Sequence, residues 1–268
     1  MNTAVAAARL GAPTAFVGRV SNDEHGQAIW EFLTDSGVDL RAAQRGPEPS
    51  ARAIVDLAPG PVFRFEGDAT ADASMTAVDL SSLGPGPHLI HGGTLGIFRG
   101  TTAEVLVTLI EEHDGIVSFD PNVRPQIIDD RDAWFAYADR WIDRADVVKG
   151  SDEDFEWMGI GPETLIESGA AVVLRTLGED GLEAHLADGQ VCRVPATAAD
   201  VADTVGAGDA ICGSILTGLW ERGVTDRASL ALISPSDWDD LLRFAADVAA
   251  ITVSRPGADP PRRGALGR

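Results

Sequence analysis

The segment Asp203–Asp209 carries the strongest chemical signal in this sequence. It reads Asp-Thr-Val-Gly-Ala-Gly-Asp, and the run Ala210–Gly213 that follows is predicted to open a long helix. Two glycines around one alanine allow backbone N–H groups to converge, and a helix N-terminus adds about half a positive charge, so the segment predicts an anion hole. Asp209 then lies where its carboxylate can accept a proton from a hydroxyl that attacks a bound phosphoryl group. The alternative is a tight strand-to-helix turn in which Asp209 only stabilises the helix dipole.

The elements that would position this turn alternate between strand and helix from about residue 86 onward. Short apolar runs between turn signals predict strands at His88–His91, Gly115–Phe119, Asp146–Lys149 and Ala171–Thr176. Helical periodicity predicts helices at Thr102–His113, Asp130–Ile142, Asp152–Met158, Gly206–Trp220 and Asp237–Val253. Near-continuous apolar strands are typical of a parallel sheet covered on both faces, which makes the chain an α/β protein. Two further strands, Leu182–Ala187 and Val191–Pro195, flank a turn at Asp188-Gly189 and predict a hairpin.

The first part of the chain follows a different pattern. It predicts a helix at Thr3–Leu10, a strand at Thr14–Val20 and a helix at Gly26–Ser36. The alternating runs Ala51–Leu57 and Val62–Phe65 then predict a β-hairpin. A strand pair of this kind is either a lid over a substrate or an edge hairpin without function. The tail from Pro256 is expected to be loose.

The composition excludes several classes of protein. Of the 268 residues, 21 are Lys or Arg and 42 are Asp or Glu, which gives a formal net charge of -21. Such a surface repels nucleic acid and anionic membranes, so neither is expected as a partner. No apolar run reaches about 18 residues and no signal-peptide pattern opens the chain, so we expect a cytoplasmic protein. Two cysteines are too few for a disulfide framework, and no Cys/His cluster has zinc spacing.

Other nucleotide-binding architectures are also excluded. A Walker A loop needs Gly-Lys-Ser/Thr, but the only lysine is Lys149, which precedes Gly150. The His-Arg-Asp and Asp-Phe-Gly set of protein kinases does not occur. The pair Gly206 and Gly208 lacks the third glycine of the dinucleotide fingerprint, which argues against a dehydrogenase.

The full heptapeptide resembles the second signature of the PfkB/ribokinase family of carbohydrate kinases. That resemblance implies a ribokinase-like three-layer α/β/α sandwich with a small β lid. It implies an anion hole formed by Gly206, Ala207 and Gly208, with Asp209 as the catalytic base. Asp203 and the carbonyl of Val205 fall where some relatives hold a monovalent cation, so K⁺ is a candidate ion.

Further segments fit the same family on the sugar side. Leu10–Gly26 is similar to the family's early segment. Thr70-Ala71-Asp72 resembles a sugar-proximal segment of bacterial fructokinases, which makes Thr70 and Asp72 candidate substrate contacts. The turn Asp120-Pro121-Asn122-Val123-Arg124 matches the family pattern after a central strand, and it implies substrate contacts from Asn122 and Arg124.

The nucleotide side is represented by four segments. The family commonly has Asn-x-x-Glu near Mg²⁺ and phosphate, where this chain has Ser151 and Asp154. Asp154 is therefore a candidate Mg²⁺ contact, directly or through water, and the alternative for the pair is an ordinary helix cap. The remaining candidate nucleotide contacts come from a loop after a buried strand and from a late helix with its exit loop: Thr176, Gly178, Gly181, Ala246 and Gly257.

The resemblance spans Asn2–Pro261 and implies an ATP- and Mg²⁺-dependent sugar kinase. We expect fructose as the substrate, phosphorylated on its 6-hydroxyl. The alternative within the family is 2-keto-3-deoxygluconate, whose carboxylate Arg124 or Arg64 would face. We expect one kinase domain over residues 1–255, with 51–72 as the lid and 256–268 as exit loop and tail. The family resemblance also allows a homodimer formed through the lid.

The start of the sequence departs from the family pattern. Asn2-Thr3-Ala4 matches only the end of the family's first signature, so Asn2 is a candidate sugar contact. The opening strand with its sugar-binding Asp and the Gly-Gly pair are not found before it. We therefore expect either a misassigned start codon or a truncated chain. The latter allows a second class of function, a catalytically impaired nucleotide-binding remnant.

Overall fold

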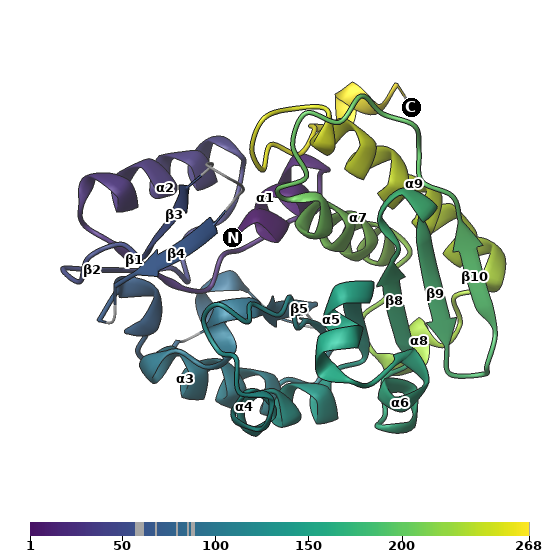
Figure 1. Cartoon of the computed structure of the whole chain (residues 1–268), viewed down its shortest axis with the longest axis horizontal. Helices are drawn as coiled ribbons and strands as arrows, with labels where there is room; N and C mark the ends of the chain where they lie inside the picture. Colours follow the sequence, from purple (N-terminus) through teal and green to yellow (C-terminus); the bar gives the residue numbers. More distant parts are fainter. Residues whose placement is uncertain (57–61, 68, 79, 85, 87–88, 268) are drawn as a thin grey trace.

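A six-stranded sheet forms the centre of the computed structural model, which describes all residues except 57–61, 68, 79, 85, 87–88 and 268 (Figure 1). The strands are ordered β10-β9-β8-β7-β6-β5. The first four along the chain pair in parallel: β5 (Ile90–Gly93), β6 (Val117–Asp120), β7 (Val147–Ser151) and β8 (Val172–Thr176). The hairpin predicted around Asp188-Gly189 is confirmed, because β9 (Leu182–Leu186) and β10 (Val191–Val194) pair antiparallel and extend the sheet beyond β8.

Both faces of this sheet are buried beneath helices, as the apolar strands indicated. Val147, Val172 and Leu174 face one core, whereas Val148 and Val173 face the other, because successive strand residues point to opposite faces. The first core is covered by α7 (Ala207–Glu221) and α9 (Pro235–Val253). The second is covered by α3 (Gly100–Glu111), α4 (Arg131–Arg144), α5 (Asp152–Met158) and α6 (Pro162–Glu167). The expected three-layer α/β/α sandwich is thus confirmed.

Two small sheets lie beside the sandwich, next to α2 (Glu24–Asp35) (Figure 1). The strands β3 (Arg52–Asp56) and β4 (Val62–Glu66) pair antiparallel, which confirms the predicted hairpin, although residues 57–61 between them lie outside the described part of the chain. The strands β1 (Arg19–Ser21) and β2 (Gln44–Gly46) pair in parallel. The strand expected over Thr14–Val20 is wrong for most of its length. A strand requires a partner beside each residue, and before Arg19 only a single bridge between Ala15 and Asp39 is present.

The two ends of the described chain pack against each other. The helix α1 (Asn2–Arg9) lies along α7, and Arg9 donates hydrogen bonds to the carboxylate of Asp259 and, at 2.8 Å, to the carbonyl of Pro260. Pro260 and Pro261 are buried. The expectation of a loose tail from Pro256 is therefore wrong, because the two prolines and an ion pair anchor it. The domain boundary at residue 255 stays a prediction.

The described helices also include α8 (Arg227–Leu230). None of the helices in the described chain is both long enough and apolar enough to span a membrane.

Candidate active site

A cavity of about 1820 Å³ lies where the four parallel strands end. The last residue of each strand lines it: Gly93, Asp120, Ser151 and Thr176. The start of α7 and the segment before β1 also line it. In open α/β sheets, the carboxyl ends of parallel strands are the usual place for a ligand. The cavity is therefore the candidate active site.

The glycines of the Asp203–Asp209 segment shape the beginning of α7. Gly206 has a φ of +84°, which L side chains rarely adopt, and a Cβ there would lie 2.6 Å from the Cβ of Ala258. A Cβ on Gly208 would lie 2.8 Å from Nζ of Lys149. Gly206, Gly208 and Asp209 all line the cavity, whereas Ala207 does not. The helix therefore presents its N-terminal backbone to the cavity without an intervening side chain, as an anion hole requires.

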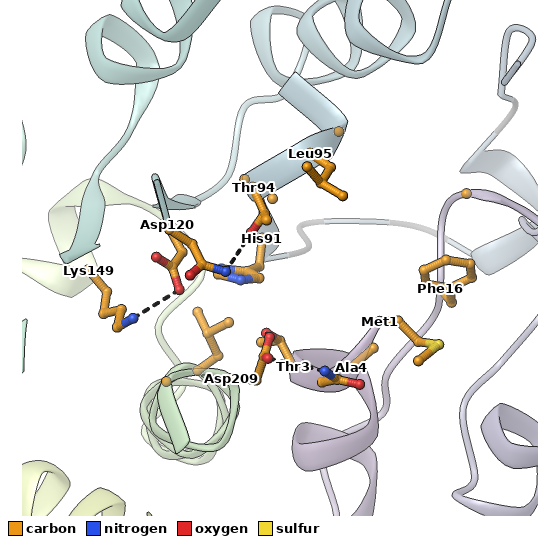
Figure 2. Close-up of a pocket in the computed structure, with 18 of the residues that line it drawn as sticks. Met1, Thr3, Ala4, Phe16, His91, Thr94, Leu95, Asp120, Lys149 and Asp209 are labelled. Atoms are coloured by element: carbon orange, nitrogen blue, oxygen red, sulfur yellow. Dashed lines mark hydrogen bonds and ion pairs between the residues drawn. The ribbon is translucent and has the colours of Figure 1, made fainter. Parts of the chain in front are cut away.

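The carboxylate of Asp209 is held by two side chains from the first turn of α1. Thr3 Oγ1 donates to Oδ1 at 2.8 Å, and Asn2 Nδ2 donates to Oδ2 at 3.2 Å. Figure 2 shows Thr3 and Asp209 pointing toward one another at the edge of the pocket. The sequence pointed to Asn2 as a sugar contact but missed Thr3, because no local spacing relates residue 3 to residue 209.

Lys149, the only lysine of the chain, is a second functional candidate that sequence reasoning missed. Its Nζ donates to Asp120 Oδ2 at 3.1 Å, and both side chains are buried (Figure 2). Burial opposes the charge on Lys149, but the carboxylates of Asp120 and Asp154 outweigh it and raise the pKa of the ammonium. The signal was present in the sequence: Asp120 and Lys149 lie near the ends of adjacent parallel strands, which meet at one edge of the sheet.

The buried surroundings perturb the other groups of this cluster. Burial raises the pKa of Asp120, with Lys149 acting in the opposite direction. Burial and the neighbouring Asp120 raise the pKa of the Cys212 thiol well above its usual value, and Cys212 Sγ lies 3.7 Å from Asp120 Oδ2. Burial lowers the pKa of His91 to about 4, so its imidazole is neutral at pH 7, where Nδ1 lies 3.1 Å from Ser118 Oγ.

Asn122 and Thr94 are joined by a hydrogen bond at the cavity wall, and both have strained backbone conformations. They are the two non-glycine residues with positive φ in the described chain, at +36° and +53°. Asn122 Nδ2 donates to Thr94 Oγ1 at 2.9 Å. Strained backbone of this kind gathers at ligand sites, which makes Thr94 a candidate that the sequence did not reveal. Arg124 also lines the cavity, and its guanidinium donates to the carbonyl of Val123.

Of the two candidate sugar contacts that follow the hairpin, Asp72 lies at the cavity and Thr70 does not. Asp72 lines the cavity and accepts a hydrogen bond from Arg99 at 2.8 Å. Thr70 is fully buried, does not line the cavity, and accepts from Arg99 through its hydroxyl. The structure therefore does not bring Thr70 to the cavity. The side chain of Arg64, on β4, lies outside the described residues.

Ser151 and Asp154 form the capping box that begins α5. Asp154 Oδ2 accepts from both the backbone N–H and the hydroxyl of Ser151, and Oδ1 accepts from Val123 N at 2.7 Å. Asp154 therefore ties α5 to the Asn122–Arg124 turn as well as lining the cavity. Nowhere in the described chain do three or more His, Cys, Asp or Glu side chains gather to hold a metal ion. A metal here would need ligands from a bound phosphate.

The remaining nucleotide-side candidates lie mostly outside the cavity wall. Thr176 lines the cavity, whereas Gly178, Gly181, Ala246 and Gly257 do not. Ala246, a residue of α9, packs in the core, and a Cβ on Gly181 would lie 2.1 Å from the carbonyl oxygen of Val194. Asp203 accepts from Val205 N at 3.0 Å and from Gly257 N at 2.8 Å, which joins the exit loop to the α7 turn. Their roles toward nucleotide or cation stay predictions.

Comparisons with known proteins agree on one family. The pfkB family of carbohydrate kinases matches residues 1–263. A fructokinase of Rhizobium leguminosarum bv. trifolii is 34% identical over 81% of this chain and 69% of its own length. A Xylella fastidiosa fructokinase solved with bound ATP superposes with a TM-score of 0.87 at 25% identity, covering 99% of this chain and 88% of its own. A Vibrio cholerae O395 fructokinase with bound fructose, ADP and calcium gives 0.81 at 27% identity, covering 99% and 88%.

Proposed function

The chain belongs to the pfkB family of carbohydrate kinases, and from this premise we propose that it transfers the γ-phosphoryl group of ATP to the 6-hydroxyl of fructose. The observation that carries the proposal is the position of Asp209. Its carboxylate lies in the first turn of α7, beside glycine backbone that opens onto the cavity. A base and an anion hole in one turn serve an attacking hydroxyl and the phosphoryl group that it attacks.

The residues present fit ATP and a divalent cation. Gly206 and Gly208 line the cavity without side chains, so a phosphate could approach the backbone at the helix N-terminus. Mg²⁺ is usually held by one or two carboxylates together with substrate phosphates, and the described chain offers Asp154 rather than a full set of ligands. The bound cation would neutralise phosphate charge. Asp203 and the carbonyl of Val205 are the proposed contacts of a monovalent cation such as K⁺.

The residues around the cavity have distinct proposed roles in phosphoryl transfer and in binding the two substrates. Asp209 accepts the proton of the sugar hydroxyl as its oxygen bonds to phosphorus and the bond to the ADP oxygen breaks. Asn2 and Thr3 hold that carboxylate in place. Asp72, Asn122 and Arg124 are the proposed contacts of the sugar, and Ser151 and Thr176 those of the nucleotide.

Fructose is proposed because the named relatives are fructokinases, one of them solved with fructose. One observation favours a second candidate, 2-keto-3-deoxygluconate. Arg124 lines the cavity, and within the described chain its guanidinium bonds a backbone carbonyl and forms no ion pair with a carboxylate. An unpaired guanidinium suits the carboxylate of a sugar acid. The homodimer through the lid stays a prediction.

A coupled assay with ATP and a panel of sugars tests the proposal. We expect the highest kcat/KM with fructose, and Asp209→Asn should lower turnover by about 10²–10⁴ while ATP binding persists. Asp188→Asn, on the exposed turn between β9 and β10, is the matched control and should leave turnover unchanged.

Three outcomes would contradict the proposal in different ways. Preference for 2-keto-3-deoxygluconate, abolished by Arg124→Gln, would replace fructose with the sugar acid. ATP binding without turnover on any sugar would favour the nucleotide-binding remnant. Full turnover of Asp209→Asn would show that Asp209 only stabilises the helix.

A further inference from the structure

We propose that Lys149 supplies a fixed positive charge to the phosphoryl site, and that Asp120 positions it beneath the first turn of α7. The inference rests on the proposed function, because it assigns a role at the same anion hole. It adds a cationic side chain to the anion hole, whose other proposed groups are backbone N–H dipoles.

The position of Lys149 follows from the sheet. β6 and β7 are adjacent and parallel, so Asp120 at the end of β6 and Lys149 near the end of β7 meet at the same edge. The ammonium is drawn to Asp120 Oδ2 at 3.1 Å. On its other side it lies against Gly208, where a Cβ would come within 2.8 Å of Nζ. Lys149 and Gly208 both line the cavity.

The charges around the cavity suggest what the ammonium of Lys149 does. Two further carboxylates, those of Asp154 and Asp209, act on the carboxylate of Asp120 there and help to raise its pKa. Lys149 is the one lysine or arginine that is buried within the described part of the chain. A phosphoryl group with its own negative charge would enter beside the carboxylates of Asp120 and Asp209. Lys149 is placed to offset that repulsion, and a buried charge is screened little by water.

A purely structural ion pair is the competing explanation. Buried ion pairs contribute little to stability, and replacement by apolar residues of similar size is often neutral. Asp120 also leaves Oδ1 buried without a hydrogen-bond partner among the described residues, so the pair is not arranged for maximal stability. The arrangement is better suited to holding a charge toward the cavity.

The test separates charge from stability with two variants. Lys149→Met removes the ammonium but leaves the buried carboxylate of Asp120 without its ion-pair partner. The double variant Asp120→Asn/Lys149→Met removes both charges of the pair. We expect Lys149→Met to lower kcat about 10²–10³-fold, as when one oxyanion donor is lost, and to lower Tm. The double variant should recover most of the Tm while kcat stays low. Recovery of both Tm and kcat would show a structural pair and overturn the proposal.

A binding measurement gives a readout that does not depend on turnover. Mg-ADP and a non-hydrolysable ATP analogue are titrated calorimetrically into wild type and the double variant. We expect affinity for the analogue to fall at least about tenfold and affinity for ADP to change less than twofold, because the charge lies at the transferred phosphoryl group. Equal changes for both nucleotides, or none, would overturn the proposal. The calorimetric comparison tests the role of Lys149 even if the protein phosphorylates none of the sugars.

A matched control is found at the opposite end of β7. There the buried carboxylate of Asp146 pairs with Arg144 at 3.1 Å and with Arg227 at 3.3 Å, away from the cavity. Arg144→Met should lower Tm while kcat and the ratio of the two nucleotide affinities stay at wild-type values. A loss of kcat in Arg144→Met as large as in Lys149→Met would attribute both effects to general destabilisation and overturn the proposal.

Discussion

The hydroxyl of Thr3 donates a hydrogen bond of 2.8 Å to the carboxylate of Asp209, although 206 residues separate them along the chain. A glycine makes this approach feasible. On the adjoining turn of α7, a Cβ on Gly213 would lie 2.6 Å from the Cβ of Ala6 and 2.9 Å from the carbonyl oxygen of Thr3. The two helices therefore cross closely enough for the first turn of α1 to orient the proposed base.

Thr3→Val should slow the reaction without disturbing the fold. Valine keeps the shape of threonine but cannot donate to Asp209. Hydrogen bonds to charged groups contribute about 1.5–3 kcal/mol, so the loss of one in the transition state should lower kcat about tenfold or more. The control is Thr34→Val, on the exposed face of α2, where the hydroxyl donates to the carbonyl of Trp30 at 2.8 Å. If both variants retain wild-type kcat, Thr3 does not orient the base.

Gly206→Ala should weaken nucleotide binding as well as stability. The residue has a φ of +84°, and a Cβ would overlap Ala258. The backbone strain costs about 1–2 kcal/mol, and relief of the overlap must shift the α7 turn itself. We expect a lower Tm and at least about tenfold weaker binding of ATP by calorimetry.

Gly189 offers the matched comparison for this substitution. Its φ is +86°, a Cβ there would meet nothing within 4 Å, and it lies on the β9–β10 turn. Gly189→Ala should therefore lower Tm through strain alone and leave ATP binding unchanged. Equal loss of ATP affinity in both variants would disprove a specific role of the α7 turn.

Asp154→Asn should impair both stability and the response to Mg²⁺. The amide cannot accept hydrogen bonds from both Ser151 and Val123, and an unpaired buried donor costs about 1–3 kcal/mol. Urea unfolding should show that loss, and the Mg²⁺ concentration for half-maximal rate should rise. Asp237→Asn is the control, because it breaks the equivalent capping box between Ser234 and Asp237 at the start of α9. It should lower stability and leave the Mg²⁺ requirement unchanged. An unchanged Mg²⁺ requirement in Asp154→Asn would restrict Asp154 to capping.

The free energy of unfolding should depend on His91 in mildly acidic solution. Burial lowers its pKa to about 4 from 6.5, with the nearby Asp209 opposing that shift and the Met1 amino group and Lys149 adding to it. The unfolded chain therefore binds more protons below pH 6.5, so the stability that neutral His91 contributes is present above 6.5 and is lost as the pH falls toward 4. His91→Gln should flatten the Tm profile between pH 6.5 and 4. His25→Gln, at an exposed position, should follow the wild-type profile.

The sequence predicted best what local pattern determines. Strand periodicity located the sheet, and the glycines around Ala207 located the turn that presents Asp209. The helix cap that the sequence offers as the alternative for Ser151 and Asp154 is present, and their contacts with nucleotide and Mg²⁺ stay predictions. These features depend on residues within a few positions of one another, so short-range rules suffice for them.

The features that were missed depend on contacts between distant segments. The sequence tests Lys149 only against the Walker A pattern, which it does not fit, because its partner Asp120 is 29 residues away and no local pattern relates the two. The strain at Thr94 arises where its loop meets the Asn122 turn. In the tail, Pro260 accepts a hydrogen bond from Arg9 in α1, and Arg262 donates one to the carbonyl of Asp35 at the end of α2. Such contacts follow from the arrangement of the elements, which no local pattern specifies.

The packing of α1 on α7 also has a consequence for synthesis. Ala6 and Leu10 are buried where α1 meets α7, since Ala6 lies against Gly213 and Leu10 packs with Ala210. A ribosome adding about 5–20 residues per second needs about 10–40 s to pass from Thr3 to Asp209, so the face of α1 that packs on α7 stays uncovered for that time. Phosphoryl-transfer competence should therefore arise only after the last third of the chain has emerged, and in refolding it should return later than helical circular dichroism.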